Sequence, residues 1–252
     1  MTAIGRPVSV FALSGLVAGG LIAAAPAAAA ETTRAVLELF TSQGCSSCPP
    51  ADKLFGDYSA RGDVLALSYP VDYWDYLGWK DTLASHDNSD RQRAYAAARG
   101  DRQVYTPQIV VDGREHVVGS NRDAIEAALK RQSPTGLPVA MTVADTADST
   151  KVDVGAAPPG TAMQGTIWYV MYDSAVVVPI GRGENSGRTV TYHNVVRRLR
   201  PIAMWKGEKM SVDLPKSEMM QAKADHCAVF LQSESSGGLP GAMLGAASDS
   251  SE

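Results

Sequence analysis

Two of the three cysteines in the 252-residue chain are separated by only two residues, in the motif Cys45-Ser46-Ser47-Cys48. The motif follows a short apolar run, Val36–Phe40, typical of a buried strand, and it precedes Pro49 and Pro50, which fit the first turn of a helix. A sulfur at a helix N-terminus lies near unpaired N–H groups and the positive end of the helix dipole, and both favour the thiolate. The sequence therefore predicts Cys45 as the attacking nucleophile and Cys48 as the cysteine that closes the disulfide.

The same pair of cysteines allows other interpretations. A purely structural disulfide across so short a loop would stabilise the chain little. A tetrahedral zinc site would need a second ligand pair; no second Cys-x-x-Cys or His-x-x-x-His motif exists, and Cys227, His226 or His86 would serve only if the fold brought them close. As a pair of soft ligands, Cys45 and Cys48 favour copper(I) or zinc. A periplasmic metal-handling protein and a binding module without turnover stay open as alternatives to a redox enzyme. The redox interpretation needs no bound metal and no dissociable organic cofactor.

The elements around the motif are those of a small mixed α/β domain, residues 31–133. After the first strand we expect a helix over 51–60, a strand over 63–69, a helix over 87–98, and a hairpin of 108–111 with 115–118. The Asp112-Gly113 pair marks the turn of that hairpin, and Ser120 begins a further helix. This order predicts a compact domain with the cysteines at a junction between strand and helix.

The second half of the chain has a different pattern. Ser133–Pro138 resembles a linker, and the apolar segments that follow it are short, β-rich and separated by Gly, Pro, Asp and Ser. We expect an all-β, sandwich-like domain over 138–232. Residues 233–252 are rich in Gly, Ser and Ala, which predicts a disordered tail.

The first 30 residues resemble a secretory signal peptide. Arg6 precedes an apolar run, Val8–Ala25, which ends in small residues rather than in a basic flank. The sequence thus predicts a periplasmic or secreted protein that has no membrane segment after cleavage. The formal charge of −4 comes with no basic arm, which argues against nucleic acid or an anionic membrane as the main partner. The oligomeric state cannot be read from the chain.

Several motifs together resemble known families. The segment Leu37–Asp52, with Tyr105–Gln108 and Val111–Gly113, is similar to the thioredoxin superfamily. That resemblance implies a thioredoxin-like N-terminal domain, Cys45 as nucleophile, Cys48 as resolving cysteine, and Pro107 as a cis proline facing the sulfurs. More narrowly, the segments Val71–Trp79 and Gly181–Asn185 resemble a family of secreted bacterial proteins catalogued as domain of unknown function 1223. The thioredoxin resemblance implies exchange of disulfides with proteins or small thiols, whereas the narrower family has no assigned substrate.

Residues outside the motif are predicted to bind the partner. With Thr106 and Pro107 beside the cysteines, the adjacent peptide groups can pair with an extended strand of the partner. Tyr73 and Trp74 belong to an aromatic run that either walls the sulfur site or covers a long insertion. In many thioredoxins a buried acid lies six residues before the first cysteine; here that residue is Leu39, so the acid–base group is unassigned.

Overall fold

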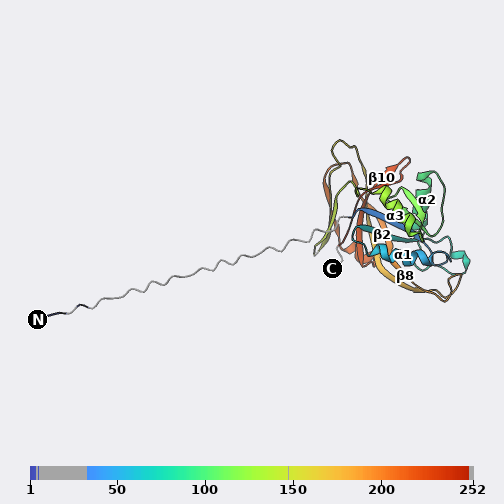
Figure 1. The fold of residues 1–252 in the computed structure, drawn as a ribbon, viewed down its shortest axis with the longest axis horizontal. Helices are drawn as coiled ribbons and strands as arrows, with labels where there is room; N and C mark the ends of the chain where they lie inside the picture. Colours follow the sequence, from blue (N-terminus) through green and yellow to red (C-terminus); the bar gives the residue numbers. More distant parts are fainter. Residues whose placement is uncertain (4, 6–32, 147, 250–252) are drawn as a thin grey trace. The chain divides into compact units, whose positions relative to one another are not determined.

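The computed structural model describes residues 1–3, 5, 33–146 and 148–249, and the predicted signal peptide, residues 1–30, lies largely outside them. Contacts group residues 31–252 into one compact unit. Figure 1 traces its elements, which are β1 (Ala35–Thr41), α1 (Pro49–Ser59), β2 (Val64–Pro70), the 3-10 helix η1 (Asp75–Leu77), α2 (His86–Arg99), β3 (Gln108–Val111), β4 (Glu115–Val118), α3 (Arg122–Gln132), β5 (Met141–Asp145), β6 (Ser149–Val154), β7 (Gly165–Pro179), β8 (Thr189–Trp205), β9 (Met210–Pro215), α4 (Ser217–Ala222), β10 (His226–Ser235) and β11 (Leu239–Ser248).

Strand β1 is buried on both faces, which explains its unbroken apolar character. Leu37 and Leu39 point to one face, where they pack with Phe55 of α1 and Ile125 of α3. Alternate residues such as Phe40 point to the other face, into a core shared with α2, β7 and β10. Because side chains alternate along a strand, β1 separates α1 and α3 from α2 and fixes the direction in which its C-terminal loop leaves the sheet.

The predicted fold class, an α/β thioredoxin-like domain followed by a separate all-β domain, is wrong. Strands from both halves of the chain form one mixed eight-stranded sheet, in the order β11-β10-β7-β8-β2-β1-β3-β4. The two halves join where Ser68 of β2 pairs in parallel with Val195 of β8, next to a hydrogen bond of 2.8 Å from the Asn194 amide to the Ala66 carbonyl. Segment-by-segment patterns found the strands but carry no information on which distant strands share an edge.

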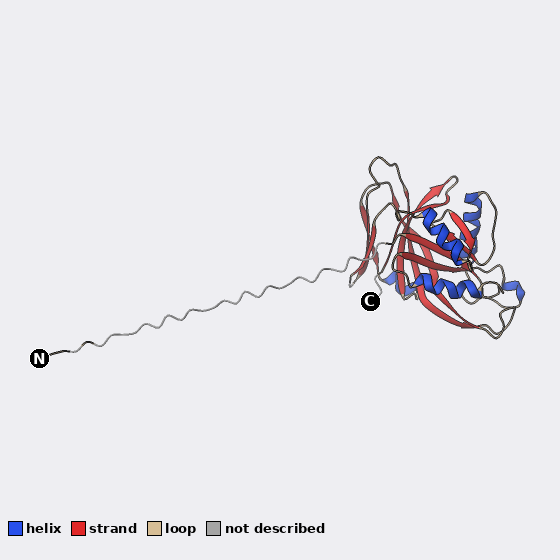
Figure 2. Cartoon of the chain, in the orientation of Figure 1, coloured by secondary structure: helices blue, strands red, loops and turns tan. Residues whose placement is uncertain are grey.

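A second, three-stranded sheet has the order β5-β6-β9. Its apolar face, with Val152 and Val154, packs on Ile167 of β7 and Val229 of β10 in a second core. Figure 2 shows the strands of both sheets in red and the helices in blue. The sandwich-like packing expected for the second half therefore exists locally, but one of its two layers continues into the sheet that contains β1.

The predicted disordered tail is wrong for the residues that the structure describes. Leu239–Ser248 forms β11, which pairs antiparallel with β10. A Cβ on Gly241 would lie 2.8 Å from the Ser233 carbonyl oxygen, and one on Gly245 would lie 2.5 Å from that of Val139. The small residues that suggested disorder are the ones that let neighbouring backbones approach this strand.

Local signals in the first half are confirmed. Asp112 and Gly113 both have positive φ, 48° and 69°, and link β3 to β4 as a hairpin turn. Helix α2 begins one residue before the predicted range, with Ser85 as its N-cap, and ends at Gly100 in the left-handed conformation. Among the described residues, no helix is long and apolar enough to cross a membrane.

Candidate functional site

Cys45 and Cys48 form a disulfide at the start of helix α1, with their Cα atoms 5.4 Å apart. Cys48 is the N-cap of the helix, and its carbonyl accepts hydrogen bonds from the N–H groups of Ala51 and Asp52. Cys48 is completely buried, Cys45 keeps 4% of its surface exposed, and Ser46 and Ser47 are exposed. A partner therefore reaches the sulfur of Cys45 before that of Cys48.

The loop that ends in Pro107 lies beside the sulfur of Cys45. The Thr106–Pro107 peptide bond is cis, as the resemblance implied. The Cys45 Sγ atom lies 3.7 Å from the Thr106 carbonyl oxygen, and the Ser47 hydroxyl lies 3.3 Å from the same sulfur and 3.4 Å from the same oxygen. The structure thus brings together four residues with predicted roles, namely Cys45, Cys48, Thr106 and Pro107.

The predicted aromatic residues have different surroundings. The Trp74 indole N–H donates to the Thr106 hydroxyl at 2.8 Å, and its ring stacks with that of the exposed Tyr76, with centroids 6.2 Å apart. The Tyr73 hydroxyl instead donates to Gln92 of α2 at 3.0 Å, and burial raises the pKa of Tyr73 to about 12. Trp74 therefore lies beside the sulfur site, whereas the hydroxyl of Tyr73 is used in packing against α2.

Residues far along the chain hold the loop that carries Cys45. The amide of Asn185, in the connection between β7 and β8, donates to the carbonyls of Gln43 and Cys45 at 3.0 and 2.8 Å. Trp79 donates to the Gln43 side chain at 2.7 Å, and the buried Asp81 accepts the Gln43 N–H at 2.7 Å. The sequence analysis assigned no role to Asn185, although it ends one of the motifs that carried the family resemblance.

A buried acid that the sequence analysis missed lies one helical turn after Cys48. Asp52 is 2% exposed, accepts the Thr41 hydroxyl at 2.6 Å through Oδ1, and has no hydrogen-bond partner at Oδ2. Burial raises its pKa to about 8, while the hydrogen bond from Thr41 lowers that pKa and the charge of Asp81 raises it. The spacing of four residues places Asp52 and Cys48 on the same face of the helix, so the signal was present in the sequence.

The other candidate metal ligands do not join the cysteine pair. The His86 ring lies 2.9 Å from Asp72, and His226 lies 3.5 Å from Asp249. Cys227 is fully buried in β10, and burial raises the pKa of its thiol to about 12. Within the described part of the chain, no group of three or more His, Cys, Asp and Glu side chains is arranged to hold a metal ion.

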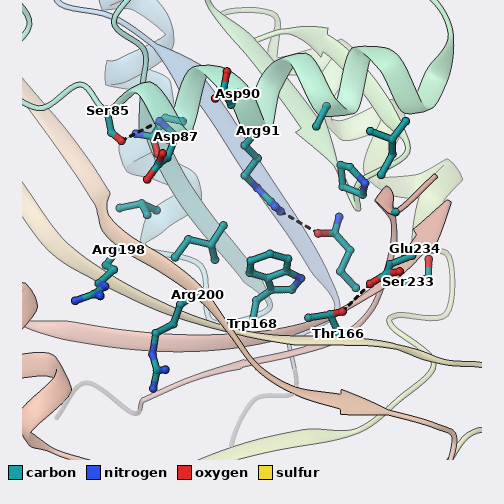
Figure 3. A pocket seen from close by; sticks show the side chains of 18 of the residues that line it. Ser85, Asp87, Asp90, Arg91, Thr166, Trp168, Arg198, Arg200, Ser233 and Glu234 are labelled. Carbon is teal, nitrogen blue, oxygen red and sulfur yellow. Dashed lines mark hydrogen bonds between the residues drawn. The ribbon is translucent and has the colours of Figure 1, made fainter. Parts of the chain in front are cut away.

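A cavity of about 590 Å³ lies away from the cysteines, between α2 and strands β7, β8 and β10. Figure 3 shows Arg91 of α2 pointing into the cavity toward Trp168 of β7. The Arg91 guanidinium also donates to the Gln232 side chain at 3.1 Å. Arg91 is already paired with the buried Glu38 at 2.7 Å, so its charge is used within the protein. The wall also mixes both signs of charge, from Asp87, Asp90, Arg198, Arg200 and Glu234. This cavity offers a ligand no dominant charge, and no cysteine lines it.

Fold and site together define a protein with a mixed sheet that presents a Cys-x-x-Cys disulfide at a helix N-terminus. The family model described as Protein of unknown function (DUF1223) matches residues 36–232, and the chain belongs to this family. A crystal structure of a protein from Agrobacterium tumefaciens is 36% identical, covers 89% of this chain and 99% of that chain, and has a TM-score of 0.78. HBP35 of Porphyromonas gingivalis shares only the fold: 11% identity, coverage of 87% and 75%, and a TM-score of 0.57. No curated protein matches the chain.

Proposed function

We propose that this protein exchanges disulfides with thiols of proteins or small molecules, using Cys45 as nucleophile and Cys48 as resolving cysteine. The observation that carries the proposal is the pair itself: a disulfide at the N-terminus of α1 whose outer sulfur lies beside the Thr106 carbonyl. The helix N-terminus stabilises a thiolate on Cys45, and the short loop lets the ring reopen and close with little backbone movement.

The reaction proceeds in two balanced steps. The Cys45 thiolate attacks a partner disulfide, so that a mixed disulfide forms and one partner thiolate leaves. The Cys48 thiolate then attacks the Cys45 sulfur, closes the ring and expels the second partner thiolate. Two electrons pass from the protein to the partner, and the reverse sequence oxidises a partner dithiol.

Asp52 is the group that we assign to proton transfer at Cys48. Cys48 must lose its proton before it attacks, and no solvent reaches its buried sulfur. The Asp52 carboxylate lies one helical turn away with an oxygen that has no other partner, and a pKa of about 8 allows it to exchange a proton near neutral pH. In many thioredoxins the acid that transfers the proton lies six residues before the first cysteine, but here that residue is Leu39, which cannot do so. Asp52 is buried and has an unpartnered oxygen, and both features support its assignment to this role.

The partner is expected to bind across Thr106 and Trp74. The site combines an exposed edge at Ser46 and Ser47 with the indole of Trp74 and the stacked ring of Tyr76. Main-chain groups beside Pro107 suit an extended segment of the partner. We further propose membership of the thioredoxin superfamily and a periplasmic or secreted location, on the motifs and the N-terminal segment described above.

Trapping the mixed disulfide tests this function. Replacing Cys48 by Ser removes the resolving thiol, so Cys45 should accumulate a covalent partner that dithiothreitol releases. The control variant Cys45→Ser keeps one cysteine of the motif but should trap nothing, and Cys227→Ser should behave like the parent protein because that thiol is buried. Equal trapping by the two single-cysteine variants, or by neither, would rule out the proposed division of roles.

A further inference from the structure

A groove of about 580 Å³ runs beside the cysteine motif, between helix α1 and the first half of strand β8. We refer to it as the α1–β8 groove, lined by Pro49, Lys53, Arg188, Thr189, Val190, Thr191 and His193. Because side chains alternate along a strand, Thr189, Thr191 and His193 share one face of β8, whereas Val190 and Tyr192 turn into the core. The groove is therefore a row of polar side chains facing the N-terminal turns of α1.

The lining carries basic groups and no acid. Lys53 and Arg188 are exposed cations, and neither Asp nor Glu is among the lining residues. Within the described part of the chain, neither of these two cations makes an ion pair. Other arginines of the protein each form an ion pair with one of its carboxylates, namely Arg61, Arg91, Arg122, Arg131 and Arg197. The groove thus concentrates positive charge that the protein itself leaves uncompensated.

Each of the two cations lies on a segment that also contacts or contains the cysteine motif. Pro49 is bonded to Cys48, and Lys53 follows one turn later on the same helix. Arg188 comes three residues after Asn185, whose amide donates to the Cys45 carbonyl at 2.8 Å. A molecule that binds both Lys53, on α1, and Arg188, just before β8, is therefore held next to the cysteine motif.

The position of His193 depends on a glycine inside α1. A Cβ on Gly56 would lie 2.9 Å from Nε2 of His193, so a larger residue at this point would displace the ring from its place against the helix. Glycine in the middle of a helix costs about 0.5–1 kcal/mol relative to alanine. At Gly56 this cost comes with room for the His193 imidazole beside the groove. An imidazole can donate a hydrogen bond in either protonation state.

We propose that the α1–β8 groove binds a small thiol or disulfide that carries carboxylate groups, and that it selects such molecules as substrates. The inference rests on the proposed exchange reaction and adds its substrate class. Lys53 and Arg188 bind the carboxylates, and the threonine hydroxyls and His193 supply further hydrogen-bond donors. The alternating arrangement along β8 suits an elongated ligand, since Thr189 and His193 are about 13 Å apart at the rise of a strand.

The exchange with such a molecule is balanced without another reactant. The Cys45 thiolate attacks one sulfur of the small disulfide, and the first small thiolate leaves. Cys48 then attacks Cys45, the protein disulfide closes, and the second small thiolate leaves. The anionic groups of the bound half hold it at the groove during both steps.

Two disulfides that differ in charge test the inference. We would measure oxidation of the reduced protein by glutathione disulfide, which is an anionic probe, and by bis(2-hydroxyethyl) disulfide, which is neutral. The double variant Lys53→Gln/Arg188→Gln should lower kcat/KM for glutathione disulfide about tenfold, or ~1.4 kcal/mol, and leave the neutral disulfide unchanged. The rate with glutathione disulfide should also fall as salt is added, because salt screens exposed charges.

A matched control removes the same charges elsewhere. Lys80 and Arg182 are exposed and do not line the groove, so Lys80→Gln/Arg182→Gln should change both rates less than twofold. If the two double variants behave alike, or if the groove variant slows both disulfides equally, the groove does not select by charge and the inference is wrong.

A second probe separates this inference from the exchange reaction. S-methylglutathione has the carboxylates but no exchangeable sulfur, and its binding to the oxidised protein can be measured by calorimetry. Binding that the groove variant loses, together with no oxidation by either disulfide, would leave the anion site standing and overturn the exchange reaction. Oxidation by both disulfides without binding of S-methylglutathione would support the exchange reaction and overturn the anion site.

Discussion

Two buried carboxylic acids lie on opposite sides of β1, and their partners differ. Glu38 points toward α2 and is fully buried; Arg91 donates to it at 2.7 Å and the Tyr95 hydroxyl also donates to it. Asp52 lies on the side of α1, accepts one hydrogen bond from Thr41, and has an oxygen with no partner. The two acids are buried to the same degree, so burial alone does not separate them.

The difference lies in what compensates the charge. The Arg91 guanidinium neutralises Glu38 and also lies 5.0 Å from the ring centroid of Tyr95 and 5.2 Å from that of Phe230. Among the residues that the structure describes, no cation pairs with Asp52, so burial dominates and raises its pKa to about 8. A paired buried acid holds the fold together, whereas an uncompensated one beside a cysteine is available for proton transfer.

Removing the cation from the first region should have the largest effect. Arg91→Ala leaves Glu38 buried without its counter-charge, and we expect the free energy of unfolding to fall by about 3–5 kcal/mol. Urea denaturation measures this value. The exposed neighbour Arg93 pairs with Asp90, and Arg93→Ala should cost less than about 1 kcal/mol.

The double variant Glu38→Gln/Arg91→Met sharpens this result. It removes both charges while keeping similar volumes, so it should recover much of the stability that Arg91→Ala loses. A double variant as unstable as Arg91→Ala would mean that the packing of Arg91 among the aromatic rings, and not the uncompensated charge, accounts for the loss.

Asp52→Asn should change the pH dependence of both stability and exchange. The folded-state pKa of about 8 lies above the ordinary value of about 3.8, so the unfolded chain loses this proton first as pH rises. Wild-type stability should therefore decline as pH rises between those two values, by about 1.4 kcal/mol per pH unit, so that by pH 6 the wild type should have lost about 3 kcal/mol relative to D52N. Ring closure by Cys48 should accelerate as pH rises through about 8 in the wild type, and D52N should lack that step.

Asp57→Asn is the matched control for Asp52. Asp57 is exposed on the same helix and pairs with Arg122 at the surface. Its variant should keep the wild-type pH profile of ring closure. A profile for D52N that coincides with the wild type would remove Asp52 from the reaction while leaving the roles of the cysteines untouched.

The same comparison shows what the sequence could and could not predict. The motif, the strand before it and the helix after it were accessible because turn residues, proline and spacing act locally, whereas the cis Pro107 was implied only by the family resemblance. Alternation along β1 places Glu38 and Leu39 on opposite faces of the strand. Asp52, to which we assign proton transfer at Cys48, was not predicted, because the resemblance places the acid before the first cysteine and not four residues after the second.

Contacts between segments far apart in the chain were also not predicted. The junction of β2 with β8 depends on a single pair, Ser68 with Val195, and no local pattern marks it. The contact of Asn185 with the Cys45 loop spans 140 residues, so its role as a positioning group is visible only in three dimensions. The small residues of β11 predicted disorder because their close packing against neighbouring backbones cannot be inferred from composition.

Thr41→Val should give the smallest change, because it removes a single hydrogen bond from Asp52. The hydroxyl of Thr41 donates to Oδ1 at 2.6 Å and lowers the pKa of Asp52, so its loss should move the pH midpoint of ring closure upward. The free energy of unfolding should fall by about 1 kcal/mol, the usual cost of one unsatisfied buried acceptor. Thr41→Ser keeps the hydroxyl and should leave the midpoint in place. An unchanged midpoint in Thr41→Val would show that the proton taken from Cys48 does not pass through Asp52.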